Sequence, residues 1–198
     1  MGNAMYKTGC KTALLSGMLW LVGCSDPSWQ TKDISGLMPP LDFELISEEA
    51  RSVTEADYVG DVTLLFFGFT HCPHICPTTL TNLAAISQEL GEEAQNDLRV
   101  LFVSVDPNRD DPATLREYTD AFGPEFTGLT GDEEALQALT RRYRVTYGYG
   151  KKDDAGNYDV SHSNAVFAFD RDGDARLLIR EDDPKEAVMA DLSRLLTH

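Results

Sequence analysis

Two cysteines in one short segment are the residues of this chain best suited to chemistry. Cys72 and Cys76 lie in the sequence GFTHCPHICP, which runs from residue 68 to residue 77. A disulfide across so short a loop would constrain the unfolded chain very little, so stapling the fold is a weak explanation for the pair. Thiolates attack disulfides and bind soft metal ions, Cu(I) above all, with zinc as the usual competitor. The pair therefore predicts a redox site or a metal site.

The segments on either side of the cysteines predict how the sulfurs are positioned. Residues 62–69 form a continuous apolar run with aromatic side chains, which predicts a strand buried on both faces. Residues 78–90 predict a helix, with Pro77 at a first helical position. Sites of α/β sheets lie at the carboxyl ends of strands, where both sulfurs are expected. The helix start favours negative charge, so we expect it to lower the pKa of the Cys76 thiol.

The rest of the chain continues the alternation of strands and helices. The further segments are a strand at 98–105, a helix at 113–122, a short strand at 126–130, a helix from Asp132 to about Tyr143, a hairpin of 164–169 with 176–179, and a last helix after 183–184. Alternation predicts parallel strands with right-handed crossovers, and the closing hairpin makes the sheet mixed. We therefore predict an α/β, thioredoxin-like fold, a mixed sheet flanked by helices with a C-terminal hairpin and helix.

One histidine is expected to lie close to the two cysteines in this fold. His162 directly precedes the first strand of the hairpin. In thioredoxin-like folds the loop before that strand faces the cysteine motif, and thioredoxins carry a cis-proline there. An imidazole at this point would complete a site of two sulfurs and one nitrogen, able to hold Cu(I) or Cu(II). His71 is expected to bias the pKa of the neighbouring thiol, with a ligand role as the lesser alternative, and His74 is an exposed turn residue or an alternate ligand.

The N-terminal segment predicts export and a membrane tether. Lys7 and Lys11 precede an uncharged apolar run at residues 13–22, which is typical of a secretory signal peptide. The ending Leu-Val-Gly-Cys resembles a bacterial lipoprotein signal, in which Cys24 would be the lipidated first residue of the mature protein. A plain N-terminal anchor is the rival interpretation. The chain then divides into a signal peptide at 1–23, a tether at 24–40 and one domain at 41–198. This predicts a membrane-anchored lipoprotein facing an extracytoplasmic, periplasmic compartment.

The charge of the chain excludes one class of partner. Among 198 residues there are 33 acidic and 17 basic ones, which gives a net charge of −16. Such a surface repels the phosphates of nucleic acid, so no DNA or RNA partner is expected. It suits a cation or a basic protein, although an acidic surface also serves solubility alone.

Three segments together resemble the Sco/SenC family. They are Gly-Phe-Thr-His-Cys-Pro-x-x-Cys-Pro at 68–77, Val-Asp-Pro-x-Arg-Asp at 105–110, and His162 with Ser163. The resemblance implies a thioredoxin-fold copper protein that helps assemble the dinuclear copper centre of cytochrome c oxidase. It implies Cys72, Cys76 and His162 as copper ligands. The partner would be the copper subunit of the oxidase or another copper-accepting protein.

The chain departs from the family pattern at two positions beside the site. His74 stands where members commonly have an acidic residue, and Ser161 stands where they often have Asp. A lost carboxylate changes the surroundings of the ligands but not the ligand set. Two functions stay open at this point. One is a copper chaperone without turnover, and the other is a thiol–disulfide oxidoreductase that uses Cys72 and Cys76 to keep a partner's copper-site cysteines reduced.

Overall fold

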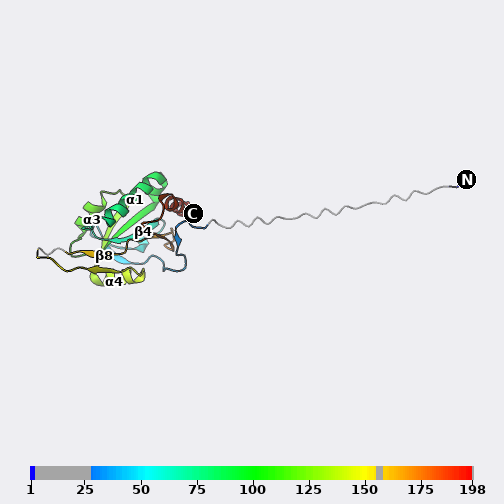
Figure 1. The fold of residues 1–198 in the computed structure, drawn as a ribbon. Coiled ribbons are helices and arrows are strands. Elements are labelled where there is room, and N and C mark those ends of the chain that lie inside the picture. The colour runs from blue at the N-terminus through cyan, green and yellow to red at the C-terminus, as the bar shows by residue number, and fades with distance from the viewer. Residues whose placement is uncertain (3–27, 155–157, 198) are drawn as a thin grey trace.

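The computed structural model describes residues 1–2, 28–154 and 158–197, and these form a mixed sheet covered by helices (Figure 1). In the described residues the main sheet has eight strands in the order β1-β10-β9-β4-β5-β6-β2-β3. The parallel centre consists of β4 (Val62–Gly68), β5 (Leu98–Ser104) and β6 (Phe126–Thr130). Antiparallel strands flank it, namely β9 (Val166–Phe169), β10 (Ala175–Ile179), β1 (Lys32–Asp33), β2 (Glu44–Ser47) and β3 (Ser52–Thr54).

Helices cover both faces of the sheet. They are α1 (Ile75–Leu90), α2 (Glu92–Asp97), α3 (Pro112–Thr119), α4 (Glu133–Arg142) and α5 (Lys185–Leu196), with a short 3-10 helix at Glu55–Tyr58. Figure 1 shows α4 on the opposite side of the sheet from α1 and α3. No helix of the described part of the chain has the length and apolar character needed to cross a bilayer.

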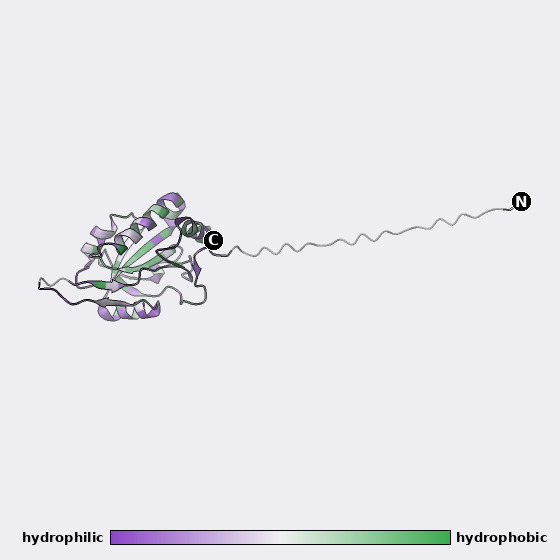
Figure 2. Cartoon of the chain, viewed as in Figure 1, coloured by the Kyte–Doolittle hydropathy of each residue, from purple (hydrophilic) through white to green (hydrophobic). Residues whose placement is uncertain are grey.

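Strand β4 divides the hydrophobic core into two parts because successive side chains point to opposite faces. Leu64 and Phe66 pack with the residues of α1, α3 and α5, whereas Leu65 and Phe67 pack with those of α4. Every residue of β4 is buried. In Figure 2 the central strands are accordingly hydrophobic, while the outer faces of the helices are hydrophilic. Phe66 and Gly68, near the end of the strand, therefore face the side of the sheet that α1 covers.

The structure confirms the predicted thioredoxin-like architecture and moves several boundaries. Helix α1 begins at Ile75, so Pro77 is the third helical residue and Cys76 the second. Helix α3 ends at Thr119 and not at residue 122. Helix α4 begins next to Asp132, close to the predicted start, and the Asp132 side chain caps it by accepting a hydrogen bond from the N–H of Ala135 at 2.8 Å. Several elements were not predicted from the sequence, namely β1, β2, β3, α2 and a separate pair of strands, β7 (Tyr147–Tyr149) and β8 (Val160–His162).

The described part of the predicted tether, residues 28–40, packs on the domain. Strand β1 pairs with β10, and Trp29 lies against the core. The buried Asp191 carboxylate of α5 accepts hydrogen bonds from the backbone N–H groups of Gln30 and Thr31 and from the Thr31 hydroxyl. Ordered structure therefore starts before residue 41. The predicted lipidation site Cys24 and the signal peptide assigned to residues 1–23 lie outside the described residues, apart from residues 1–2.

Candidate metal centre

The two cysteines lie at the carboxyl end of β4, where the chain turns into α1. Cys72 is half-buried on the turn, and its N–H donates to the carbonyl of Phe69 at 3.1 Å. Cys76 is fully buried in the first turn of α1. Its backbone N–H donates to the Cys72 sulfur at 3.4 Å. At the helix start this N–H therefore donates to the Cys72 sulfur, whereas the sequence analysis placed the effect of the helix start on Cys76.

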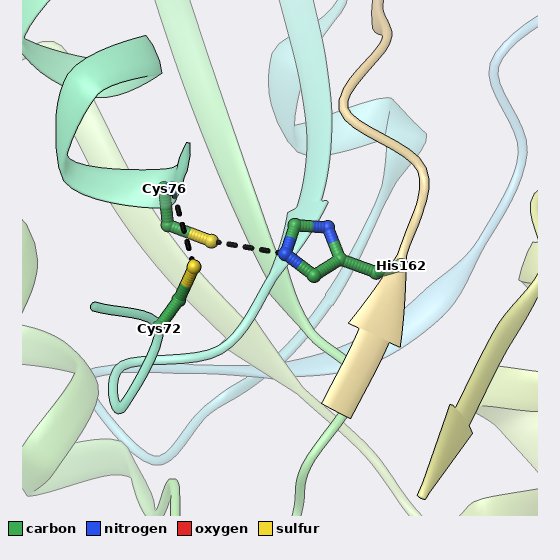
Figure 3. Close-up of side chains that lie close together, drawn as sticks. All are labelled: Cys72, Cys76 and His162. Carbon is green, nitrogen blue, oxygen red and sulfur yellow. Dashed lines mark hydrogen bonds between the residues drawn. The ribbon is translucent and has the colours of Figure 1, made fainter. Parts of the chain in front are cut away.

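His162 reaches the two sulfurs from a distant part of the sequence. It is the last residue of β8, and its Nε2 lies 3.4 Å from the Cys76 sulfur (Figure 3). Its Nδ1 lies 2.8 Å from the carbonyl oxygen of Ser163. Because a carbonyl only accepts hydrogen bonds, Nδ1 carries the proton and Nε2 presents a lone pair to the Cys76 thiol. The ring also packs edge-on against Phe69, with centroids 5.6 Å apart.

These three side chains form a donor set that fits a soft or borderline metal ion. Their ligand atoms, two sulfurs and one nitrogen, all lie within 4.8 Å of one another. In the described residues this is the one group of three or more such side chains close enough to share an ion. Two thiolates suit Cu(I), and an imidazole nitrogen extends the site to Cu(II). The geometry thus brings together all three residues that the sequence analysis singled out.

Burial corrects the prediction made for the Cys76 thiol. Removal from water raises the pKa of Cys76, because desolvation disfavours the thiolate, and the neighbouring Cys72 sulfur acts in the same direction. The sequence analysis predicted a lowered pKa from the helix start alone. The raised pKa favours the thiol form of Cys76 in the metal-free protein, and its sulfur lies 3.4 Å from Nε2 of His162, within hydrogen-bond distance. A metal ion that binds here displaces that proton.

The other two histidines of the motif lie outside the donor set. His71 is exposed, and its Nδ1 lies 3.1 Å from the Thr70 hydroxyl and 3.7 Å from the Asp110 carboxylate. His74 is exposed at the N-cap position of α1 and makes no side-chain cap hydrogen bond. Ser161, at the other departure from the family pattern, is exposed and donates to the carbonyl of Gly148 at 3.3 Å. Neither departure removes a member of the donor set.

Gly68, the first residue of the cysteine motif, has a role in the site that the sequence analysis did not assign. A Cβ added at this position would lie 2.5 Å from the Phe102 ring and 2.7 Å from the Cys76 sulfur. Real Cβ atoms do not approach other atoms so closely, so the absence of a side chain at Gly68 makes room for Cys76. The sequence feature that could have indicated this role is the position of Gly68 at the end of the central strand, next to the cysteines.

We expect Gly68→Ala to displace Cys76 and to lower the free energy of unfolding by about 1 to 3 kcal/mol, the usual cost of overpacking a core. Urea unfolding measures the stability, and the alkylation rate of Cys76, followed by mass spectrometry, measures its displacement. The matched control is Gly148→Ala, whose added Cβ meets only the Ser161 hydroxyl at 3.5 Å. Unchanged stability and alkylation in the Gly68 variant would contradict the packing argument.

Known proteins similar to this chain share its fold, and some of their structures were solved with copper bound. Residues 38–197 match the SCO1/SenC family. The mouse mitochondrial SCO2 homolog is 41% identical over 135 residues, which are 67% of this chain and 52% of the mouse protein. The chain thus spans about half the length of the mouse and cattle relatives. The solved structure of Arabidopsis thaliana ScoI with copper bound is 32% identical, with a TM-score of 0.73, and the match covers 80% of this chain and 98% of that one. Bradyrhizobium japonicum ScoI with copper bound is 35% identical, with a TM-score of 0.71 and coverage of 79% and 98%.

The relatives correct the predicted localisation. The similar proteins from mouse, cattle and human are mitochondrial. This finding contradicts the predicted periplasmic lipoprotein. The prediction rested on a basic start and a short apolar run, and such a pattern identifies a targeting segment more securely than it identifies the compartment.

Proposed function

The chain belongs to the SCO1/SenC family, and from this membership and the site we propose that it is a copper chaperone. In this proposal Cys72, Cys76 and His162 hold one copper ion and release it to a copper-accepting protein. The family points to the copper subunit of cytochrome c oxidase as that partner. Copper is then cargo, and the protein has no turnover of its own.

The observation that carries the proposal is the 3.4 Å approach of His162 Nε2 to the Cys76 sulfur. A dithiol that only exchanges disulfides needs no nitrogen at this point, whereas a copper carrier gains a third ligand. The proton on Nδ1 is held by the Ser163 carbonyl, so the lone pair on Nε2 is available to a metal. The half-buried position of Cys72 gives the site one side open to a partner. Two similar proteins of known structure bind copper.

A second candidate function, thiol–disulfide exchange, is favoured by the unequal burial of the two cysteines. Cys72 is the more accessible of the two, and its sulfur accepts a hydrogen bond from the N–H of Cys76. The Cys72 thiolate would attack a partner disulfide to form a mixed disulfide, and the released partner thiolate would take a proton. Cys76, once deprotonated, would then attack the Cys72 sulfur and release the second partner thiol. The partner gains two electrons, and this chain ends with a Cys72–Cys76 disulfide.

A transfer experiment separates the two functions. The Cu(I)-loaded protein is mixed with the metal-free copper-binding domain of an oxidase subunit whose cysteines are already reduced. We expect copper to move to the acceptor, measured as metal in each protein after chromatographic separation. The double variant Cys72→Ser with Cys76→Ser is the control. If the reduced acceptor receives no copper, while the metal-free protein reduces an oxidised acceptor, the reductase function replaces the chaperone.

A further inference from the structure

The loop that follows β5 contacts both halves of the metal centre. This loop, residues 105–111, contains the Val-Asp-Pro-x-Arg-Asp sequence, to which the chemistry of the three ligands assigns no role. One half of the centre is the cysteine turn after β4. The other half is the β7–β8 hairpin, which ends at His162. We call residues 105–111 the bracket loop.

Asp110 ties the bracket loop to the cysteine turn. Its side chain is fully buried and accepts hydrogen bonds from the backbone N–H of Thr70 at 2.9 Å and from the Thr70 hydroxyl at 2.6 Å. It also accepts one from the Ser104 hydroxyl at 2.6 Å. Thr70 lies two residues before Cys72, so Asp110 fixes the start of the turn that carries the sulfurs.

Asp106 ties the same loop to the hairpin. This fully buried carboxylate accepts a hydrogen bond from the Tyr158 hydroxyl at 2.6 Å and forms an ion pair with Arg109. The Arg109 guanidinium lies 3.8 Å from the centre of the Tyr158 ring, a cation–π contact. The Tyr149 hydroxyl donates to the carbonyl of Val105 at 2.6 Å. Tyr149 and Tyr158 belong to the two sides of the hairpin, so both sides are held.

Arg109 also links the loop to the surroundings of the imidazole. Its guanidinium lies 5.7 Å from the centre of the Phe69 ring, and Phe69 is one of the rings that pack edge-on against His162. Arg109 thus contacts both Phe69, which lies beside His162, and Tyr158, which holds the hairpin.

The hairpin depends on such contacts because it is not part of the main sheet. Among the residues that the structure describes, strands β7 and β8 pair only with each other, and Tyr147 pairs directly with His162. An isolated two-stranded hairpin is marginally stable in water, so its position is set by side-chain contacts and not by a continuous ladder of backbone hydrogen bonds. The polar contacts described above run from that hairpin to the bracket loop.

We propose that Asp106, Arg109 and Tyr158 are positioning residues, which hold the hairpin so that His162 meets the two sulfurs. None of them belongs to the donor set of the metal. Because outer partners of metal ligands typically change metal affinity by about 10- to 100-fold, we expect an effect of that size on Cu(II). Cu(I) affinity is expected to stay close to wild type, since two thiolates carry it. Only this copper effect rests on the proposed function.

The test uses Tyr158→Phe and Asp106→Asn, with Tyr147→Phe as the control. Tyr158→Phe removes only the hydroxyl that donates to Asp106 and keeps the ring against Arg109. The control makes the same change on β7, opposite His162. In the metal-free protein, NMR measures the nuclear Overhauser effect between the His162 and Phe69 rings, and urea unfolding measures stability. Competition with a chelator measures Cu(I) and Cu(II) affinity separately.

We expect the contact between the two rings to weaken in both test variants and to persist in the control, with Cu(II) affinity falling and Cu(I) affinity retained. If Asp106→Asn does not fold, the milder Tyr158→Phe still decides. A loss of stability with an unchanged ring contact and unchanged Cu(II) affinity would overturn the proposal, because that is the result of a purely structural role. If the wild-type protein binds no copper, the proposed function fails, while the ring contact in the metal-free variants still tests the positioning role.

Discussion

Replacing Cys76 by serine is expected to abolish stoichiometric Cu(I) binding. Cys76 and Cys72 supply the only two sulfurs in the donor set, and Cu(I) strongly prefers soft thiolate ligands. A serine hydroxyl is nearly the same size but is a hard, weak ligand. With one sulfur and one imidazole remaining, the site cannot compete with a Cu(I) chelator that the wild-type protein resists. Metal analysis after dialysis against that chelator measures the loss.

Cys72→Ser is expected to lose Cu(I) as well, although the two cysteines differ in burial. Cys76 is fully buried in the core cluster beneath α1, whereas Cys72 is half-buried at its edge. Serine at residue 76 is still able to donate its hydroxyl to His162 Nε2, so we expect both variants to stay folded. Urea unfolding checks this point. Retention of one Cu(I) per chain by the double serine variant would disprove the site assignment.

The central strands could be predicted because each is a continuous apolar run that is recognisable in the sequence by itself. The apolar runs of β4 and β5 are buried along their whole length, and such runs identify central strands without any knowledge of their neighbours. Strands β1 and β7 have no such signal. Lys32 and Asp33 of β1 are exposed, and that strand forms because the adjoining segment is held by Asp191, which lies far away in the sequence. A polar segment of this kind has the composition of a linker.

The ligands could be predicted, but their environment could not. Cysteine spacing and the place of His162 before a hairpin strand are local features of the sequence. The raised pKa of Cys76 comes mainly from its burial in a core cluster, whose residues come together only in the folded chain. The same holds for Tyr158, which lies 52 residues from the carboxylate that it contacts. Residue types predict which atoms bind, whereas tertiary packing determines their protonation and position.

Replacing His162 by alanine is expected to separate copper carriage from thiol exchange. The substitution removes the single nitrogen of the donor set and leaves both sulfurs and the start of α1 in place. Cu(II) should suffer far more than Cu(I), since two thiolates can hold the softer ion nearly linearly, while Cu(II) requires nitrogen and a higher coordination number. Removing a residue that contacts a metal ligand typically lowers metal affinity by about 10- to 100-fold. Removing the ligand His162 itself should lower Cu(II) affinity by more than that. Disulfide exchange should survive, because the N–H of Cys76 still reaches the Cys72 sulfur.

Three measurements decide the outcome for this variant. The sulfur-to-Cu(II) charge-transfer absorption should collapse or shift, transfer of Cu(II) to an acceptor should fail, and reduction of a model disulfide should continue at the wild-type rate. His162→Phe fills the space beside Phe66 and Phe69 without a nitrogen, so it separates loss of a ligand from loss of packing. His74→Ala is the matched control, because that exposed histidine of the same motif lies outside the donor set. If His162→Ala binds Cu(II) like the wild-type protein and loses disulfide exchange, the carrier proposal is wrong, and the reductase function takes its place.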